Sequence, residues 1–312
     1  MRKLAFLFPG QGSQVPGMGR ELSEKHAVAR RTLEEADQAL GFPLSRLCWD
    51  GPAEELQWTA NTQPAILACS VAAYRVLQER GVSPAYVAGH SLGEYSALVA
   101  AGSIDFSDAL RIVRRRGQYM QEAVPAGTGA MAALLGLARD QVEELCRGAA
   151  NGEVVTPANF NTPGQIVVAG NVGAVERVME SALAAGAKRA LQLPVSAPFH
   201  CSLMQPAQQR LVPELQSVRF SDLRFPLVNN VRAEEVKTGP QARQGLIDQI
   251  PSPVLWEQSV RRLLSLGIEQ FIEVGPGRVL TGMLRQIDRK VPAVNVEDEK
   301  SLDKALVALG DG

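Results

Sequence analysis

The feature of this 312-residue chain that most constrains its fold is a Gly-x-Ser-x-Gly turn between a predicted strand and a predicted helix. Residues 85–88 form a short apolar run, Gly89, Ser91 and Gly93 make the turn, and a helical pattern covers 94–101. A strand that turns sharply into a helix lifts the serine hydroxyl clear of the sheet, and the glycines lack the Cβ atoms that would collide there. The helix also points its unpaired N–H groups at the turn. We therefore predict an α/β fold with a nucleophilic serine.

Ser91 needs a base, because an unaided serine hydroxyl is a poor nucleophile at neutral pH. The chain has three histidines. His26 lies in a charged, amphipathic helical segment, 20–40, where we expect a solvated surface side chain. His90 is next to the serine, and adjacent side chains diverge on a sharp turn. His200 lies in a proline-broken stretch that can reach the edge of the sheet, so we expect it to be the base.

The acid of a full catalytic triad is missing from the pattern. Hydrolases with this turn usually supply an acid between the serine and the histidine in chain order. The acidic residues of the main domain in that interval do not follow a convincing strand: Glu94, Asp105, Asp108 and Glu122. We therefore favour a Ser–His dyad in which a backbone carbonyl holds the imidazole tautomer.

Arg116 lies on the apolar face of a predicted helix. Helical spacing places it in one stripe with Ile112 and Met120, whereas Arg114 and Arg115 project outward. A guanidinium on an apolar face needs an anion. The spacing leaves two partners equally open, a protein carboxylate in a buried ion pair or a substrate carboxylate held by a bidentate fork.

A second glycine-rich loop, residues 9–14, follows the first predicted strand, residues 4–8. Val15 holds the position of the last glycine in G-x-G-x-x-G, and the loop lacks the Gly-Lys-Ser/Thr end of a P-loop. The loop therefore fits neither phosphate-binding pattern, although its backbone N–H groups can still turn toward an oxyanion.

The order of the predicted elements indicates two domains. Strands and helices alternate through residues 1–126 and 197–312, which indicates a large α/β domain with a mostly parallel sheet and helices on both faces. Residues 127–196 follow the strand-helix-strand-strand-helix-strand order of an inserted ferredoxin-like α+β subdomain. Its predicted strands are 130–135, 154–159, 165–169 and 187–193, and its predicted helices are 140–147 and 172–185.

Composition excludes several classes of function. The 32 basic residues nearly balance the 33 acidic ones, so the chain lacks the basic excess typical of a nucleic-acid partner. Its four scattered cysteines contain no C-x-x-C pair, which argues against a disulfide framework and a structural zinc site and fits a reducing cytoplasm. No apolar run approaches the roughly 18 residues of a membrane span, and the run at residues 4–8 is too short for a signal peptide.

Several blocks of the sequence together resemble the malonyl-CoA:acyl-carrier-protein transacylases of bacterial fatty-acid synthesis. The resemblance covers nearly the whole chain, and the blocks stand in the right order. They are residues 8–14, 61–65, 89–94, 116–117, 120–123, 127–131, 159–161, 163–165, 199–200, 249, 253–256 and 273–277.

The resemblance implies a hydrolase-like α/β domain with a ferredoxin-like insert and an active site in the cleft between them. It implies that Ser91 is the acylated nucleophile, that His200 is its general base, and that Arg116 pairs with the free malonyl carboxylate. In related polyketide acyltransferases a Phe-His pair, here Phe199 with His200, accompanies malonyl rather than methylmalonyl use.

The resemblance also assigns supporting groups. The backbone N–H groups of Gln11 and Leu92 are expected to form the oxyanion hole, and the main-chain carbonyl of Gln249 is expected to orient the histidine. Asn159 is expected near the pocket. No metal and no redox cofactor is implied, since malonyl-CoA is a substrate.

The implied reaction transfers malonyl from malonyl-CoA to the phosphopantetheine thiol of acyl carrier protein through a malonyl-serine, in a ping-pong mechanism. Three alternatives remain open: a serine thioesterase or hydrolase that releases a free acid, a discrete acyltransferase that loads polyketide carriers, and a non-catalytic scaffold. We expect a monomer, because no apolar stripe is left over. An acidic carrier should dock on basic residues, although a solvated surface is the simpler interpretation of each candidate: Lys188, Arg189, Arg285, Arg289 and Lys290.

Overall fold

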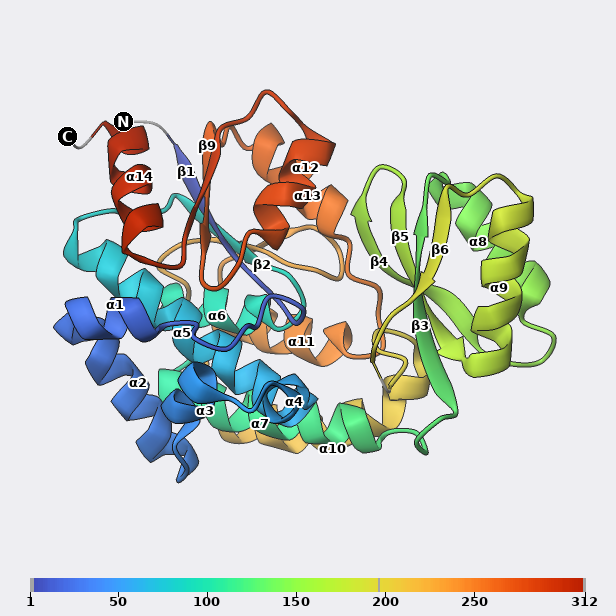
Figure 1. The fold of residues 1–312 in the computed structure, drawn as a ribbon, viewed down its shortest axis with the longest axis horizontal. Coiled ribbons are helices and arrows are strands. Elements are labelled where there is room, and N and C mark those ends of the chain that lie inside the picture. Colours follow the sequence, from blue (N-terminus) through green and yellow to red (C-terminus); the bar gives the residue numbers. More distant parts are fainter. Residues whose placement is uncertain (1–2, 196, 311–312) are drawn as a thin grey trace.

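The computed structural model describes residues 3–195 and 197–310, which form two lobes around two β-sheets (Figure 1). The large lobe contains a six-stranded sheet, and the small lobe contains a four-stranded sheet formed between Gly129 and Gln192. The predicted domain limits at residues 1, 196 and 312 lie outside the described residues.

The large sheet is centred on β1, whose apolar run is almost completely buried. The strand order is β10-β9-β1-β2-β7-β8, and each neighbouring pair runs parallel except β7 with β8. Continuous apolar runs are typical of parallel strands that helices cover on both faces. The mostly parallel sheet is thus confirmed. Its strands are β1 (Leu4–Phe8), β2 (Tyr86–Gly89), β7 (Leu227–Val228), β8 (Glu235–Val236), β9 (Gln270–Val274) and β10 (Ala293–Val296).

Alternate side chains of β1 enter two different hydrophobic layers, as the period-2 geometry of a strand requires. Phe6 and Phe8 pack edge-on against Tyr74 in one layer. Ala5 and Leu7 belong to the other layer. The helices around the sheet are α1 (Arg20–Lys25), α2 (Ala27–Leu40), α3 (Leu44–Asp50), α4 (Ala53–Gln57), α5 (Thr59–Glu79), α6 (Gly93–Ala100), α7 (Phe106–Glu122), α10 (Gln205–Ser217), α11 (Gly239–Gln249), α12 (Trp256–Ser265), α13 (Val279–Ile287) and α14 (Glu299–Leu309), with a 3₁₀ turn at Ser202–Met204.

The small sheet is antiparallel, with the order β4-β5-β3-β6. Its helices pack together beside the sheet around a separate hydrophobic core, and Figure 1 shows both on the side away from the large lobe. The elements follow the predicted order, with bounds that differ by a few residues. They are β3 (Gly129–Leu135), α8 (Arg139–Ala149), β4 (Val155–Thr162), β5 (Gln165–Asn171), α9 (Val172–Ala184) and β6 (Arg189–Gln192).

Backbone hydrogen bonds tie the edge of the small sheet to the large lobe. The Phe160 N–H donates to the carbonyl of Val254 at 2.9 Å, and the Val254 N–H donates to the carbonyl of Ala158 at 2.9 Å. These bonds fix β4, and therefore one wall of the space between the lobes, against the segment that precedes α12. Among the described helices, none combines the length and apolarity that crossing a membrane requires.

The expectation that His26 is a solvated side chain within a helical segment over residues 20–40 is wrong. The helix is broken at His26, which has an extended backbone (φ −120°) between α1 and α2. The imidazole Nε2 lies 2.7 Å from a carboxylate oxygen of Glu299 on α14, and the His26 side chain is only 11% exposed. This contact could not be predicted from local sequence, because His26 and Glu299 come together only when α14 packs beside the N-terminal helices.

Candidate active site

The turn after β2 has the strained geometry that its glycines predict. The backbone of Ser91 has φ +50°, in the left-handed region that residues other than glycine rarely adopt. A Cβ on Gly89 would lie 1.9 Å from the carbonyl carbon of Gly93, and a Cβ on Gly93 would lie 2.0 Å from the carbonyl oxygen of Phe8. Both positions therefore require glycine, and α6 starts close enough to the sheet to hold the serine between strand and helix.

The structure brings His200 to Ser91 across 109 residues of sequence. The two side chains meet at 2.8 Å between Oγ and Nε2. The other ring nitrogen, Nδ1, lies 3.1 Å from the carbonyl oxygen of Gln249, at the C-terminal end of α11, so an Nδ1–H can donate to it. This arrangement leaves Nε2 as the acceptor that faces the hydroxyl. It matches the expected dyad held by a main-chain carbonyl.

Burial and the nearby charge of Arg116 lower the pKa of His200 to about 3. The imidazole is therefore neutral, the form that accepts a proton, over the physiological pH range. When His200 takes the proton of Ser91, the imidazole becomes a cation. Because burial disfavours this charged form, the histidine must pass the proton on quickly.

Arg116 extends from α7 into the same space and is 2% exposed. Its Nη2 donates to Ser91 Oγ at 3.1 Å and to Gln249 Oε1 at 3.0 Å, and its Nη1 donates to Gln63 Oε1 at 2.8 Å. Its hydrogen-bond partners are therefore neutral oxygens. Within residues 3–195 and 197–310, no carboxylate forms an ion pair with this guanidinium.

Gln11 and Leu92 both lie close to Ser91. Gln11 lines the cavity at Ser91, with its side-chain Nε2 donating to Thr59 Oγ1 at 3.3 Å, and Leu92 follows Ser91 directly. Neither backbone N–H donates a hydrogen bond to any part of the chain that the structure describes. Two free donors next to a nucleophile are what an oxyanion hole needs.

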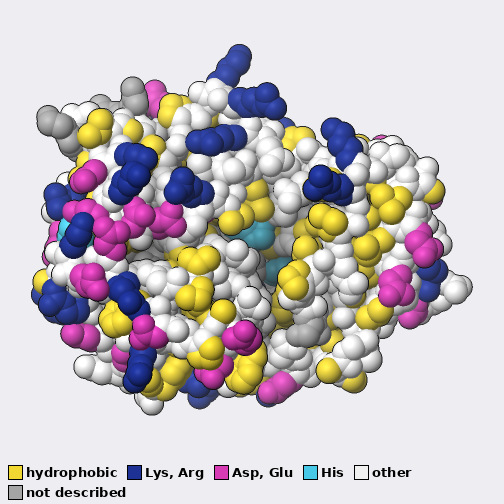
Figure 2. Space-filling view, viewed as in Figure 1, with side chains coloured by type: hydrophobic (Ala, Val, Ile, Leu, Met, Phe, Trp, Pro, Cys, Tyr) yellow, Lys and Arg dark blue, Asp and Glu magenta, His cyan; other side chains and the backbone are white. Residues whose placement is uncertain are grey.

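A cavity of about 490 Å³ opens over these groups, between the lobes. Figure 2 shows a hollow in this face of the molecule with histidine side chains inside it, and Lys and Arg side chains on the surface above it. Met131 and Asn159 enter the cavity from β3 and β4 of the small lobe, so Asn159 lies near the pocket as expected. The lining also includes Gln11, Gln63, His90, Ser91, Arg116, Met120, Phe199 and His200.

The sequence did not reveal the side chains that hydrogen-bond to the backbone of the turn around Ser91. The Ser91 N–H donates to Asn230 Oδ1 at 2.7 Å, and Asn230 Nδ2 donates to the Gly89 carbonyl at 2.7 Å. The Gln249 side chain also contributes, since its Nε2 donates to the Ser91 carbonyl at 3.0 Å. The position of Asn230 just beyond β7 was the available signal, because functional groups gather at the carboxyl ends of parallel strands.

The comparisons with known proteins agree with this geometry. The family model of the acyl transferase domain matches residues 5–304. The chain therefore belongs to the acyl transferase family, and it is an acyltransferase enzyme.

Individual relatives narrow this class. The chain is 50% identical over 98% of its length to the malonyl CoA-acyl carrier protein transacylase of Escherichia coli (strain K12), covering 99% of that protein. It is 45% identical over 99% of its length to the Bacillus subtilis (strain 168) protein of the same name, covering 98% of it. The chain thus falls among the malonyl CoA-acyl carrier protein transacylases, as the resemblance indicated.

Solved structures give the same fold. An acyl carrier protein S-malonyltransferase from Vibrio cholerae superposes with a TM-score of 0.95 at 50% identity, covering 97% of this chain and 99% of that one. The malonyl-transacylase structure described as PlMCAT:AntF, with a type II PKS acyl-carrier protein, superposes with a TM-score of 0.96 at 48% identity, covering 98% and 99%.

Two absences apply to the described part of the chain. It brings together no group of three or more His, Cys, Asp or Glu side chains that could hold a metal ion. The thiols of Cys48, Cys69, Cys146 and Cys201 are buried and free of disulfides.

The neutral imidazole predicts the acid side of the pH profile. We expect the kcat/KM for acylation of Ser91 by an acyl-CoA, which reports on the free enzyme, to be maintained down to about pH 5, because the base remains unprotonated there. Rapid-quench acylation measured across the pH range checks this, with circular dichroism at each pH as the control for folding. A loss of kcat/KM centred near pH 6.5, the ordinary pKa of histidine, would contradict it.

Proposed function

We propose that this chain transfers a malonyl group from malonyl-CoA to the phosphopantetheine thiol of an acyl carrier protein in fatty-acid biosynthesis. One observation carries the proposal: Ser91 Oγ lies 2.8 Å from His200 Nε2 and 3.1 Å from Arg116 Nη2, inside one cavity. A hydroxyl with a base can accept an acyl group, and a guanidinium beside it can hold an anionic end of that group.

The position of the cation supports a short diacid as the acyl group. In malonyl, a single methylene separates the carboxylate from the carbonyl carbon that the serine attacks. The guanidinium touches the hydroxyl itself, so only a carboxylate near the acyl carbon can reach it. An uncharged acyl group would offer the guanidinium no carboxylate to bind directly, and would forgo the charge-assisted hydrogen bonds that a carboxylate provides.

The mechanism follows from the same contacts. Ser91 attacks the thioester carbonyl while His200 takes its proton, and the carbonyl oxygen turns toward the Gln11 and Leu92 N–H groups. His200 then gives the proton to the departing thiol of CoA, which leaves a malonyl-serine. The carrier thiol attacks this ester with His200 again as base, and Ser91 recovers its proton. This ping-pong chemistry needs neither a metal nor a redox cofactor.

A second candidate function uses the same chemistry on a different carrier. The PlMCAT:AntF structure, 48% identical to this chain, is described as a type II PKS acyl-carrier protein with its malonyl-transacylase. Loading of polyketide carriers is therefore a specific alternative for this chain. A serine hydrolase of neutral esters fits less well, because such substrates offer no anion to the buried cation in the acyl pocket.

The carrier is proposed to dock beside the cavity mouth. The candidate basic residues are all exposed, and Lys188 also lines a groove of about 480 Å³ with Arg139 and Phe160. The Lys and Arg side chains that Figure 2 shows above the hollow would attract an acidic carrier protein. The docking candidates are Lys188, Arg189, Arg285, Arg289 and Lys290.

The remaining structural assignments are also proposals. We assign residues 127–196 to a ferredoxin-like subdomain inserted into a hydrolase-like domain of residues 1–126 and 197–312. The order β4-β5-β3-β6 with two helices beside it supports this assignment. We further propose that the enzyme acts as a monomer in the cytoplasm, where its free thiols would stay reduced.

The serine intermediate is tested by intact mass spectrometry of the enzyme after exposure to malonyl-CoA. We expect one malonyl adduct that acyl carrier protein then removes as malonyl-carrier, and Ser91→Ala should abolish the adduct. Ser96→Ala is the matched control and should keep the adduct, because Ser96 is a buried serine on α6, the helix that follows Ser91, and lies outside the cavity. Release of free malonate without loading of the carrier would favour the hydrolase, and wild-type enzyme without any adduct would refute the proposal.

The role of Arg116 is tested by substrate preference. We expect Arg116→Ala to lower the kcat/KM for malonyl-CoA by roughly a hundredfold, corresponding to about 3 kcal/mol for a lost buried charge pair. Acetyl-CoA should be affected much less, because it has no carboxylate. Arg115→Ala is the matched control, since Arg115 points outward and pairs with Glu214. An unchanged ratio of malonyl to acetyl transfer in Arg116→Ala would remove this role.

A further inference from the structure

The proposed mechanism does not use one buried carboxyl group close to Ser91. Glu94, the second residue of α6, has no exposed surface. Its Oε2 accepts hydrogen bonds from the Asn230 N–H at 2.9 Å and from Gln249 Nε2 at 3.1 Å. Its Oε1 is buried as well, yet no described residue donates to it. An unpaired buried carboxylate oxygen is costly, so this one calls for an explanation.

Glu94 is coupled to the malonyl site through one side chain. The Gln249 amide donates to Glu94 with Nε2 and accepts from Arg116 Nη2 with Oε1 at 3.0 Å. The carboxyl group and the guanidinium thus bind opposite ends of one amide without forming an ion pair. Burial raises the pKa of Glu94 to about 7, although its hydrogen bonds and the charge of Arg116 oppose the rise.

The net charge of this buried site then depends on whether a malonyl group occupies the cavity. Above pH 7, the empty enzyme holds the positive Arg116 near an ionised Glu94, and the two charges together sum to zero. A malonyl group adds a second anion to the same water-poor space. Two buried anions with a single cation are unfavourable, and such sites respond by protonating one of the anions.

We propose that Glu94 takes up a proton from solvent on Oε1 when a malonyl carboxylate pairs with Arg116, so that the buried site is neutral in both states. The inference rests on the proposed function, because it requires a malonyl group on the serine. The step forms one O–H bond on Glu94 and breaks no bond in the substrate. Glu94 is thus a charge-compensating residue that sets how tightly an anionic acyl group is held.

The hydrogen bonds of Glu94 explain why this proton can come and go without disturbing the serine. Both donors, the Asn230 N–H and Gln249 Nε2, bind Oε2. A proton on Oε1 leaves both bonds in place, so Gln249 continues to hold Arg116 and the Ser91 carbonyl. The charge of the site changes while its geometry stays fixed.

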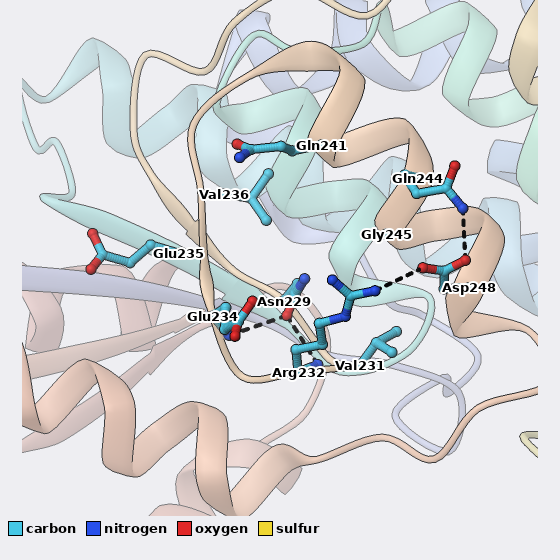
Figure 3. Close-up of a pocket in the computed structure, with 10 residues that line it drawn as sticks. All are labelled: Asn229, Val231, Arg232, Glu234, Glu235, Val236, Gln241, Gln244, Gly245 and Asp248. Carbon is cyan, nitrogen blue, oxygen red and sulfur yellow. Dashed lines mark hydrogen bonds and ion pairs between the residues drawn. The ribbon is translucent and has the colours of Figure 1, made fainter.

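The path that we propose for the proton is a cavity lined by residues of α11, which reaches Gly245 beside the unpaired oxygen. It has a volume of about 160 Å³ and is lined by Gly245 and Asn229 (Figure 3). A Cβ on Gly245 would lie 3.7 Å from Glu94 Oε1 and 3.8 Å from Asn229 Nδ2, in ordinary contact with both. The missing side chain of Gly245 therefore leaves room beside the unpaired oxygen.

Three other ionisable groups near Glu94 have pKa values shifted away from the range between pH 6.5 and 8.5. Burial and Arg116 lower the pKa of His200 to about 3, and burial lowers the pKa of His90 below its usual value. Burial raises the pKa of Tyr95, the neighbour on α6, to about 12. Across the cavity, Asp248 already binds Arg232 at 3.7 Å and accepts from Gln244 at 2.7 Å, as Figure 3 shows.

The test is the pH dependence of the malonylation equilibrium. Enzyme, malonyl-CoA and CoA are equilibrated between pH 6.5 and 8.5, and the malonyl-enzyme fraction is read by intact mass. We expect the apparent equilibrium constant to fall with pH, approaching roughly tenfold per pH unit above pH 7.5, because each malonylation then takes up about one proton. A wild-type constant that is flat with pH would overturn the inference while leaving the proposed function intact, whereas no adduct at any pH would refute both.

Two variants assign the slope to Glu94. In Glu94→Gln the amide oxygen can replace Oε2 and the charge is gone, so the fall of the constant with pH that proton uptake causes should vanish. Glu273→Gln is the matched control: Glu273 is also buried, but it accepts from the N–H groups of Leu280 and Thr281 and lies outside the cavity. It should keep the wild-type slope. Ionisation of the CoA thiol contributes the same pH dependence in the assay of every variant. A Glu94→Gln constant that varies with pH as strongly as the wild-type constant would therefore overturn the inference.

Discussion

The contact between the Arg116 guanidinium and the Ser91 hydroxyl is the constraint on which the site depends. Burying a guanidinium is costly, and here its hydrogen-bond partners are neutral oxygens. The cation therefore keeps its capacity to pair with an anion and lies 3.1 Å from the nucleophile. A serine and histidine alone would define a general acyl-transfer site. We propose that the arginine makes the same site selective for an acyl group that ends in a carboxylate.

Gln249 supports this placement, because its backbone and side chain together contact Ser91, His200 and Arg116. Its carbonyl oxygen faces His200, its Oε1 accepts from Arg116, and its Nε2 donates to the Ser91 carbonyl. The residue lies at the C-terminal end of α11, where backbone carbonyls lack partners within the helix. A single helix end thereby fixes the imidazole, the guanidinium and the strained turn relative to one another.

The sequence revealed the parts of this site that depend on local geometry. The glycines around Ser91 and the apolar stripe that contains Arg116 follow from turn and helix geometry, and the alternation of strands and helices indicated the parallel sheet. The contacts that join distant segments were not predictable in this way. His26 meets Glu299, Asn230 holds the Ser91 N–H, and the Gln249 side chain reaches Glu94 only because the sheet brings these segments together. The resemblance, rather than spacing, supplied Gln11, Leu92 and Gln249.

The most direct measurement of the central claim is a crystal structure of the enzyme trapped as its malonyl-serine ester. The account predicts a malonyl carboxylate within hydrogen-bond distance of both Arg116 Nη atoms, and an ester carbonyl oxygen directed at the Gln11 and Leu92 N–H groups. A malonyl group whose carboxylate turns away from Arg116 into solvent, with the guanidinium still bound to Gln63 and Gln249 alone, would contradict it.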